Sequence, residues 1–185
     1  MPIVLLLPLL ASMAPGGVLI DQIAIVVDQS IIKDSDIERD IRVTEFLNHE
    51  PLNLNLAERK KTANKLIDQA LIRREIREGD YQWATATQAS DQLEYLIKKR
   101  YPSRAAYQRA LKTYGFDEAD LREQFRWQLT VLQFIDARFA PSVVMPEGGS
   151  GDKTKLEAEV NRLFFAWLEQ QRKDAKIVFH EEGLA

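Results

Sequence analysis

Few side chains in this sequence are of the types that carry out acid–base or nucleophilic chemistry. The chain has no cysteine, and its two histidines are His49 and His180. A catalytic histidine needs a reacting group within hydrogen-bond reach and a third group that orients the ring. No serine or carboxylate motif frames either histidine. We therefore predict that both are solvent or interface residues and that the chain has no catalytic residue.

Two pairs of neighbouring acids are candidates for acid–base work or metal ligation: Asp34 with Asp36, and Glu181 with Glu182. Capping of a helix N-terminus explains the first pair, and a solvated tail explains the second. The sequence also has no phosphate-binding glycine loop, dinucleotide-binding glycine motif or nucleophile elbow. We predict that the protein is not an enzyme and uses no cofactor or metal ion.

Basic residues gather in three short runs, "RKK" at 59–61, "RRE" at 73–75 and "KKR" at 98–100. A nucleic-acid-binding domain typically has a strongly basic surface, whereas this chain has a formal net charge of -3 and a pI of about 5.5. We interpret the runs as the solvated faces of amphipathic helices and predict no nucleic-acid partner. Steering of acidic binding partners is a second interpretation.

Aromatic side chains are concentrated in one stretch, residues 81–116. Core packing is one interpretation, because aromatic rings dominate cores by buried area. A groove is the other, because Tyr and Trp combine an apolar face with a polar tip and so suit reversible contact with extended apolar segments. We predict that part of this set lines a substrate-binding groove. The candidates are Tyr81, Trp83, Tyr95, Tyr101, Tyr107, Tyr114 and Phe116.

The elements that must position these residues are mostly helices. Hydrophobic periodicity predicts a mainly α fold of about six helices, with a small β pairing between an N-terminal and a C-terminal strand. The first strand is expected within Ile20–Ile32, with a turn at Asp28–Ser30, and the last strand at Lys176–His180. A lone strand leaves backbone groups unsatisfied, so we expect the two strands to pair.

Capping residues predict the helix boundaries. The helices are expected from Ser35 to about Leu47, from Asn55 to Gly79, from Thr85 to Arg100, from Ser103 to Gly115, from Asp117 to Phe139, and after Asp152. The fifth helix is expected to bury Leu121, Phe125, Leu129, Leu132 and either Phe134 or Ile135. The sixth is expected to bury Leu156, Val160, Leu163, Phe164, Trp167 and Leu168.

The N-terminal residues 1–17 combine an apolar run with small residues, Ser12 and Ala14, at the spacing of a signal-peptide cleavage site. The run is too short to span about 30 Å of hydrocarbon. It predicts a signal peptide, periplasmic localisation and no stable membrane insertion. No Lys or Arg precedes the run, so a buried first element of a cytosolic domain is the alternative. We expect one core domain at 18–180 that contains a Gly- and Ser-rich linker at 142–152, and a tail at 181–185.

Four strings follow one another along the chain: "IDQIAIVVDQSIIKDSDIERDI", "ANKLIDQALIRREIREG", "YQRALKTYGFDEADLREQFRWQLTVLQFI" and "FFAWLEQQRKDAKIVF". Together they resemble the core of the SurA family of periplasmic chaperones and peptidyl-prolyl isomerases, over residues 18–179. That family usually carries parvulin isomerase domains before its closing helix. Only residues 142–152 occupy this place here, too few for a folded domain.

The resemblance implies an ATP-independent chaperone that holds unfolded outer-membrane or secreted proteins in an apolar groove, and it argues against isomerase activity. Two alternatives remain: a non-catalytic interaction or assembly module for one dedicated partner, and an isomerase of a different design. Binding of unrelated unfolded proteins would separate the chaperone from the module. A homodimer is compatible with the sequence, which does not decide the oligomeric state.

Overall fold

The computed structural model describes residues 21–143 and 153–180. The predicted signal peptide at 1–17, most of the predicted linker at 142–152 and the tail at 181–185 lie outside the described residues. Within them the chain forms six α-helices, one short 3-10 helix and one sheet. The elements are β1 (Ile23–Val27), β2 (Ser30–Lys33), α1 (Asp34–Asn48), α2 (Leu56–Glu78), α3 (Ala86–Arg100), α4 (Arg104–Tyr114), α5 (Glu118–Phe139), η1 (Ala140–Ser142), α6 (Lys153–Asp174) and β3 (Ile177–Phe179). The predicted mainly α fold is confirmed.

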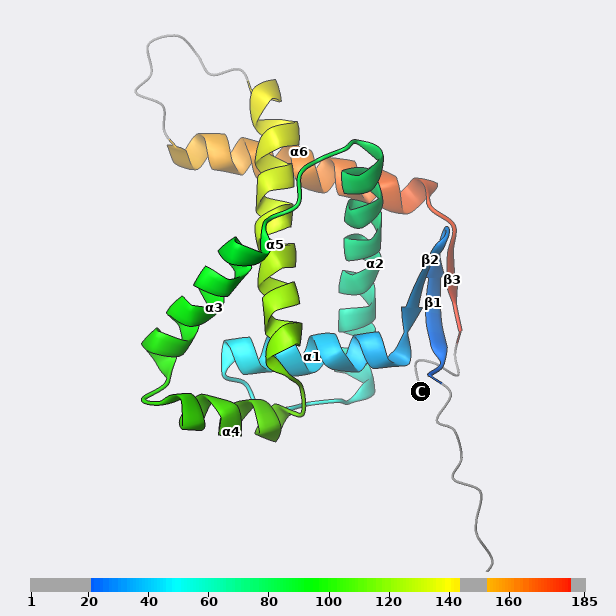
Figure 1. Ribbon diagram of the computed structural model, residues 1–185. Coiled ribbons are helices and arrows are strands. Elements are labelled where there is room, and N and C mark those ends of the chain that lie inside the picture. Colours follow the sequence, from blue (N-terminus) through cyan, green and yellow to red (C-terminus); the bar gives the residue numbers. More distant parts are fainter. Residues whose placement is uncertain (1–20, 144–152, 181–185) are drawn as a thin grey trace, which may run out of the picture.

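The sheet joins the two ends of the described chain. Its three antiparallel strands have the order β2-β1-β3, and Val26 of β1 pairs with Val178 of β3. In Figure 1 the helix α6 crosses α5 and α2 and leads into β3 beside β1. The predicted pairing of the N-terminal and C-terminal strands is therefore confirmed, and the closing helix belongs to the same body as the N-terminal strand.

The N-terminal strand and the turn after it lie where they were predicted, but the residues after the turn form a second strand that was not predicted. Asp28 adopts a φ of 51° and forms a two-residue turn with Gln29 between β1 and β2. Two-residue hairpin turns need positive φ values, which Asp tolerates better than most residues. The apolar residues after the turn consequently form a second strand that lies antiparallel to the first.

The start of α1 also differs from the prediction that Ser35 caps it. The helix begins at Asp34, and the backbone N–H of Lys33 donates a hydrogen bond to the carboxylate of Asp36 at 3.0 Å. The Ser35 hydroxyl donates instead to the carboxylate of Asp21 at 2.7 Å. The β2 strand runs directly into the helix, so no loop residue remains before Ser35 to let it act as a cap.

The other predicted helix ends agree with the structure. The side chains of Asn55, Thr85, Ser103 and Asp117 each accept a backbone N–H at the start of their helix. Gly79 and Gly115 follow α2 and α4, and Gly115 adopts a φ of 73° that an L side chain rarely tolerates.

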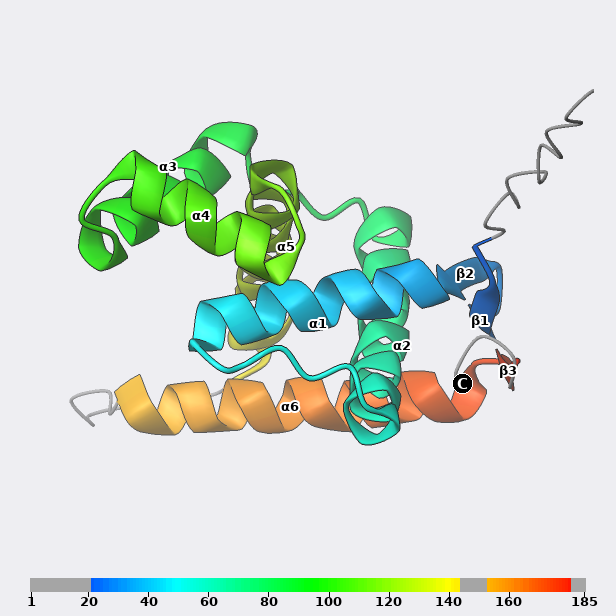
Figure 2. The same ribbon diagram turned by 90° about the horizontal axis from the view of Figure 1, so that it is seen from below.

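Two hydrophobic cores lie side by side in the molecule. The first, which we call the sheet lobe, combines β1, α2, α6, the start of α1 and the end of α5. The second, the aromatic lobe, combines the end of α1, the start of α5, and α3 and α4. Figure 2 shows α3 and α4 on one side of α1 and α6 on the other. The helices α1 and α5 therefore contribute to both cores and connect them.

The buried face of α5 is not the single stripe that we predicted. Leu132 is 59% exposed, whereas Trp127 and Phe134 are buried. Leu121 packs in the aromatic lobe, and Trp127, Phe134 and Phe139 pack in the sheet lobe. The helix changes partners along its length, so its buried face rotates. The predicted stripe of α6 is correct: Val160, Phe164 and Leu168 are buried, and Leu156, Leu163 and Trp167 pack against the same core.

Candidate functional site

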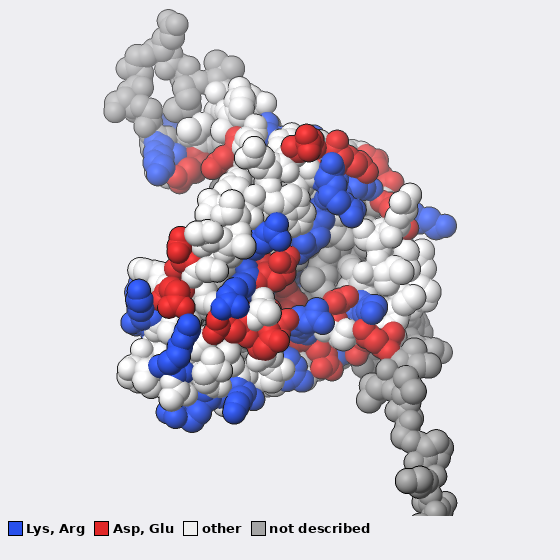
Figure 3. All heavy atoms as spheres, viewed as in Figure 1, with Lys and Arg blue, Asp and Glu red and all other residues white. Residues whose placement is uncertain are grey.

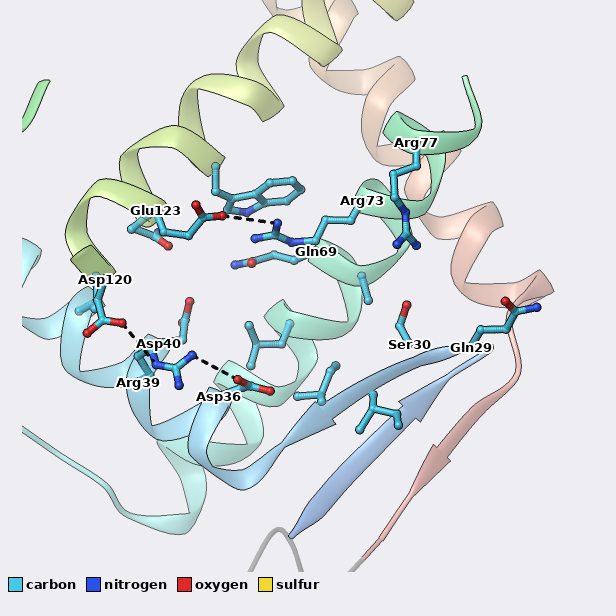
Figure 4. A pocket seen from close by; sticks show the side chains of 17 residues that line it. Gln29, Ser30, Asp36, Arg39, Asp40, Gln69, Arg73, Arg77, Asp120 and Glu123 are labelled. Atoms are coloured by element: carbon cyan, nitrogen blue, oxygen red, sulfur yellow. Dashed lines mark hydrogen bonds and ion pairs between the residues drawn. The ribbon is translucent and has the colours of Figure 1, made fainter. Parts of the chain in front are cut away.

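A cleft of about 580 Å³ lies between β2, α1, α2 and α5. Figure 3 shows the surface hollowed between α5 and α2, with charged side chains around the hollow, and Figure 4 shows the side chains that border it. Binding sites for small ligands and peptides commonly enclose about 300–1,000 Å³. The size and position of this cleft make it the candidate functional site.

Polar side chains enter the cleft from α2 at a spacing of four residues. They are Gln69, Arg73 and Arg77. Residues four apart lie on one face of a helix, so this face of α2 points to the cleft and not to the core. One face of α5 also lines the cleft. Its residues recur at helical spacing and are Asp120, Glu123, Gln124 and Trp127.

Ion pairs cross the floor and sides of the cleft. The Arg39 guanidinium lies 3.3 Å from a carboxylate oxygen of Asp36 and 3.4 Å from one of Asp120, which links α1 to α5. Arg73 lies 3.9 Å from a carboxylate oxygen of Glu123, which links α2 to α5. Solvent-exposed pairs contribute about 0–1 kcal/mol each. Such weak pairs can exchange with polar groups of a bound ligand.

The Arg73 side chain lies against an aromatic wall. Its guanidinium carbon is 4.0 Å from the ring centroid of Trp127 and 5.6 Å from that of Trp83. Burial lowers the pKa of Arg73, the Glu123 carboxylate opposes this shift, and the neighbouring charge of Arg77 adds to it. An arginine remains protonated in proteins under all ordinary conditions. Arg73 is therefore a fixed positive charge stacked on an aromatic face.

Apolar side chains also line the cleft. They come from β2, α1, α2 and α5 as Ile31, Val43, Leu66, Ala70 and Trp127. Ile31 is 55% exposed although it lies on a strand. The cleft thus combines apolar contact surface with long, flexible arginine and glutamine side chains, a combination that can adapt to ligands of different shape.

Charged contacts between α1 and α2 hold two walls of the cleft together. The buried Arg59 of α2 forms an ion pair with Asp34 and lies 3.5 Å from an oxygen of Glu38. Lys65 lies 2.9 Å from Asp40. The prediction that the run at 59–61 forms a solvated face was therefore wrong for Arg59, because α1 presents acidic groups directly opposite it.

The segment between α2 and α3 is held behind the aromatic wall. The backbone N–H of Ala84 donates to the hydroxyl of Thr130 at 3.0 Å, and Arg126 donates through Nε to the carbonyl of Ala84 at 3.0 Å. Thr130 is fully buried. These bonds place Trp83 against Trp127, with ring centroids 6.0 Å apart.

Four of the predicted groove residues surround Phe46 in the aromatic lobe. Their ring centroids lie 6.1 Å (Tyr101), 6.5 Å (Tyr107), 5.5 Å (Tyr114) and 5.2 Å (Phe116) from that of Phe46. Tyr107 is fully buried, with 0% of its surface exposed. The substrate-binding prediction was therefore wrong for Tyr107, because its ring fills the core between α1, α3 and α4. The other three rings are partly buried and pack against the same core.

The remaining three predicted residues lie apart from this group. The Tyr81 ring packs edge-on against Phe134, and its hydroxyl accepts a hydrogen bond from Arg138 at 3.2 Å. Trp83 supports the wall of the cleft from behind. Tyr95 is 61% exposed on α3. None of the seven predicted aromatics, all of which the structure describes, lines the cleft.

The polar candidates from the sequence occupy structural positions. His49 ends α1 with a φ of 60°, and the N–H of His180 donates to a backbone carbonyl of β1. Asp36 caps α1, as predicted, whereas Glu181 and Glu182 lie outside the described residues. Over residues 21–143 and 153–180, no group of three or more His, Cys, Asp or Glu side chains could hold a metal ion.

The sequence reasoning missed the cleft, although one signal for it was present. The spacing of Gln69, Arg73 and Arg77 marks a polar face of α2 that is distinct from its buried face. Taken alone, that face cannot be told from an ordinary solvated one. The partner face on α5 includes Trp127, which the predicted stripe of that helix had omitted.

Comparison of the sequence with protein-family models and with curated proteins finds no match. Among the described helices, none has a stretch long and apolar enough to cross a membrane.

Proposed function

We propose that the protein is an ATP-independent periplasmic chaperone that holds unfolded outer-membrane or secreted proteins in the cleft between β2, α1, α2 and α5. One observation carries this proposal. The apolar wall formed by Ile31, Leu66 and Trp127 borders the same cleft as four long, flexible polar side chains, those of Arg39, Gln69, Arg73 and Arg77. The resemblance of the sequence to the SurA core supports the class of client and the compartment.

Holding requires no chemical step. A chaperone that binds an unfolded client lowers the free concentration of that client and so slows aggregation, which depends steeply on concentration. Apolar contact supplies the affinity, at roughly 25 cal/mol per Å² of apolar surface removed from water. The arginine and glutamine side chains can satisfy backbone groups of many different segments, so the site does not need one particular sequence.

Suppression of aggregation tests the proposal. An outer-membrane β-barrel protein and an unrelated soluble protein are each unfolded in urea and diluted into buffer with or without the chain, and light scattering is followed. We expect a stoichiometric excess of the chain to reduce scattering for both clients, with an inert protein of equal mass as the control. Unchanged scattering for both clients would contradict the proposal.

The alternatives give different results in the same experiments. An assembly module for one dedicated partner would suppress the aggregation of at most one client. An isomerase would accelerate a refolding reaction limited by prolyl exchange, which takes roughly tens to hundreds of seconds without a catalyst. We predict no such acceleration, because residues 142–152 are too few for a parvulin domain.

A further inference from the structure

One edge of the sheet opens into the cleft. β2 pairs with β1 on one side and, within the described residues, has no strand on the other. The first three residues of β2, residues 30–32, line the cleft together with the preceding turn residue Gln29. Successive side chains of a strand point to opposite faces, so a run of consecutive lining residues means that the edge of the strand itself borders the cleft.

The backbone of Ile31 is directed toward this open edge. Val27 and Ser30 flank the two-residue turn and pair with each other, and Val26 pairs with Ile31. In an antiparallel ladder, hydrogen-bonded and non-hydrogen-bonded pairs alternate, and the pair that closes a two-residue hairpin is hydrogen-bonded. The N–H and C=O of Ile31 consequently point away from β1, where they can pair with another extended segment.

An exposed arginine, Arg77, lies at the turn end of this edge. Arg77 lines the cleft and also an adjoining cavity of about 240 Å³, which shares Gln29 and Ser30 with it. The other charged residues of the cleft have counterions: Arg39 with Asp36 and Asp120, Asp40 with Lys65, and Arg73 with Glu123. Across the described part of the chain, Arg77 forms no ion pair, and Arg73 lies one helical turn away with the same charge. Figure 4 shows Arg77 extending toward Ser30.

These features select one kind of occupant. We propose that the cleft binds an extended peptide segment as an additional strand on the edge of β2, with apolar side chains toward Leu66 and Trp127 and a carboxylate at Arg77. Backbone pairing supplies affinity that does not depend on sequence, and alternate side chains supply preference, as in other cases of strand addition. A carboxylate at Arg77 would gain a charge-assisted hydrogen bond. This inference rests on the proposed function and specifies which client segments the site prefers.

Peptide binding measured by fluorescence anisotropy tests both parts of the inference. The probe is a short labelled peptide of alternating threonine and valine with one central aspartate, and a second peptide has asparagine in its place. Two further versions of the aspartate peptide are N-methylated, one at the valines and one at the threonines, so that each removes the donors of one edge. The protein variants are Arg77→Gln and, as a matched control, Arg109→Gln on the exposed face of α4.

We expect the asparagine peptide to bind wild type about tenfold more weakly than the aspartate peptide, as a charge-assisted contact predicts. Arg77→Gln should remove this difference, and Arg109→Gln should keep it. One N-methylated peptide should bind at least about tenfold more weakly than the other, because only one edge of the added strand pairs with β2.

Two results would overturn the inference. They are equal affinity for aspartate and asparagine peptides in wild type, and equal affinity for the two N-methylated peptides. If the chain suppresses aggregation of unfolded clients but binds none of the peptides, the inference fails and the chaperone function stands. If it suppresses no aggregation either, the proposed function fails with it.

Discussion

The two lobes of the molecule are built from different parts of the chain. The aromatic lobe takes its residues from 43–47 and 93–125, which all lie in the middle of the chain, and its rings gather around Phe46. The sheet lobe needs both ends of the described chain, because it packs Ile25 of β1 with Phe164 and Leu168 of α6. Chain segments that are far apart must meet before this second core is complete. We therefore expect the lobes to differ in what destabilises them, and the cleft beside β2 to depend most on the sheet lobe.

Removal of α6 and β3 should have the largest effect. A chain that ends at Asp152 loses the buried Val160, Phe164 and Leu168, and β1 loses its pairing with β3. We expect thermal unfolding, followed by circular dichroism, to lose its cooperative transition. A chain that ends at His180 keeps β3 and serves as the control. The comparison of the lobes requires the sheet lobe to depend on the C-terminal segment. A shorter chain that melts as sharply as the control would contradict this.

Truncation of Tyr107 should have the next largest effect, and it should destabilise the aromatic lobe. Tyr107→Ser removes a fully buried ring and should lower the free energy of unfolding by about 3–5 kcal/mol in a denaturant titration. The variant should still suppress aggregation at temperatures where it stays folded, because the ring lies outside the cleft. A Tyr107→Ser protein of wild-type stability would show that the ring is not part of a core.

The hydroxyl of Tyr107 gives the aromatic lobe a dependence on alkaline pH. Burial, and then the charge of Glu118, raise the pKa of Tyr107 above its usual value. An unfolded tyrosine ionises near pH 10, so above about that pH the unfolded state binds fewer protons than the folded state, and the free energy of unfolding falls as pH rises.

The variant Tyr107→Phe isolates this effect. Its stability near neutral pH should equal or exceed that of wild type, because the buried Tyr107 hydroxyl has no hydrogen-bond partner among the described residues. Between about pH 9 and about pH 11, the denaturation midpoint should decrease less in the variant than in wild type. Equal falls in both proteins would show that Tyr107 ionises like an exposed tyrosine.

Tyr95 should give the smallest effect of the aromatic set. It is exposed on α3, so Tyr95→Ser should change the free energy of unfolding by no more than about 0.5 kcal/mol. Because Tyr95 lies outside the cleft, the affinity for the peptides used above should also stay unchanged. A clear loss of affinity would indicate that peptides bind to the aromatic lobe and not in the cleft.

Local rules predicted most of the fold. The caps at Asn55, Thr85, Ser103 and Asp117 depend on a few neighbouring residues, and the structure contains all four. The pairing of β1 with β3 followed from the need to satisfy strand backbone groups. The burial pattern of α5 could not be predicted in the same way, because the helix changes partners between the lobes and Leu132 faces solvent where a regular stripe would bury it.

The cleft could not be predicted from local rules. Arg73 belongs to a basic run that is indistinguishable from a solvated face until α5 places Trp127 and Glu123 across from it. The density of aromatic residues in the sequence indicated a binding groove, but most of these rings fill the core around Phe46. Aromatic composition alone cannot separate packing from binding, because both uses depend on the same large apolar faces.

Paired substitutions of two equally exposed apolar residues test the central claim most directly. Ile31 lies in the cleft and Leu132 lies outside it, and they are 55% and 59% exposed. Neither Ile31→Ser nor Leu132→Ser should change the free energy of unfolding by more than about 1 kcal/mol. We predict that Ile31→Ser weakens binding of an unfolded outer-membrane protein about tenfold, through lost apolar contact, and that Leu132→Ser leaves it unchanged. Equal affinity of the two variants for the client would contradict the claim that clients bind in the cleft.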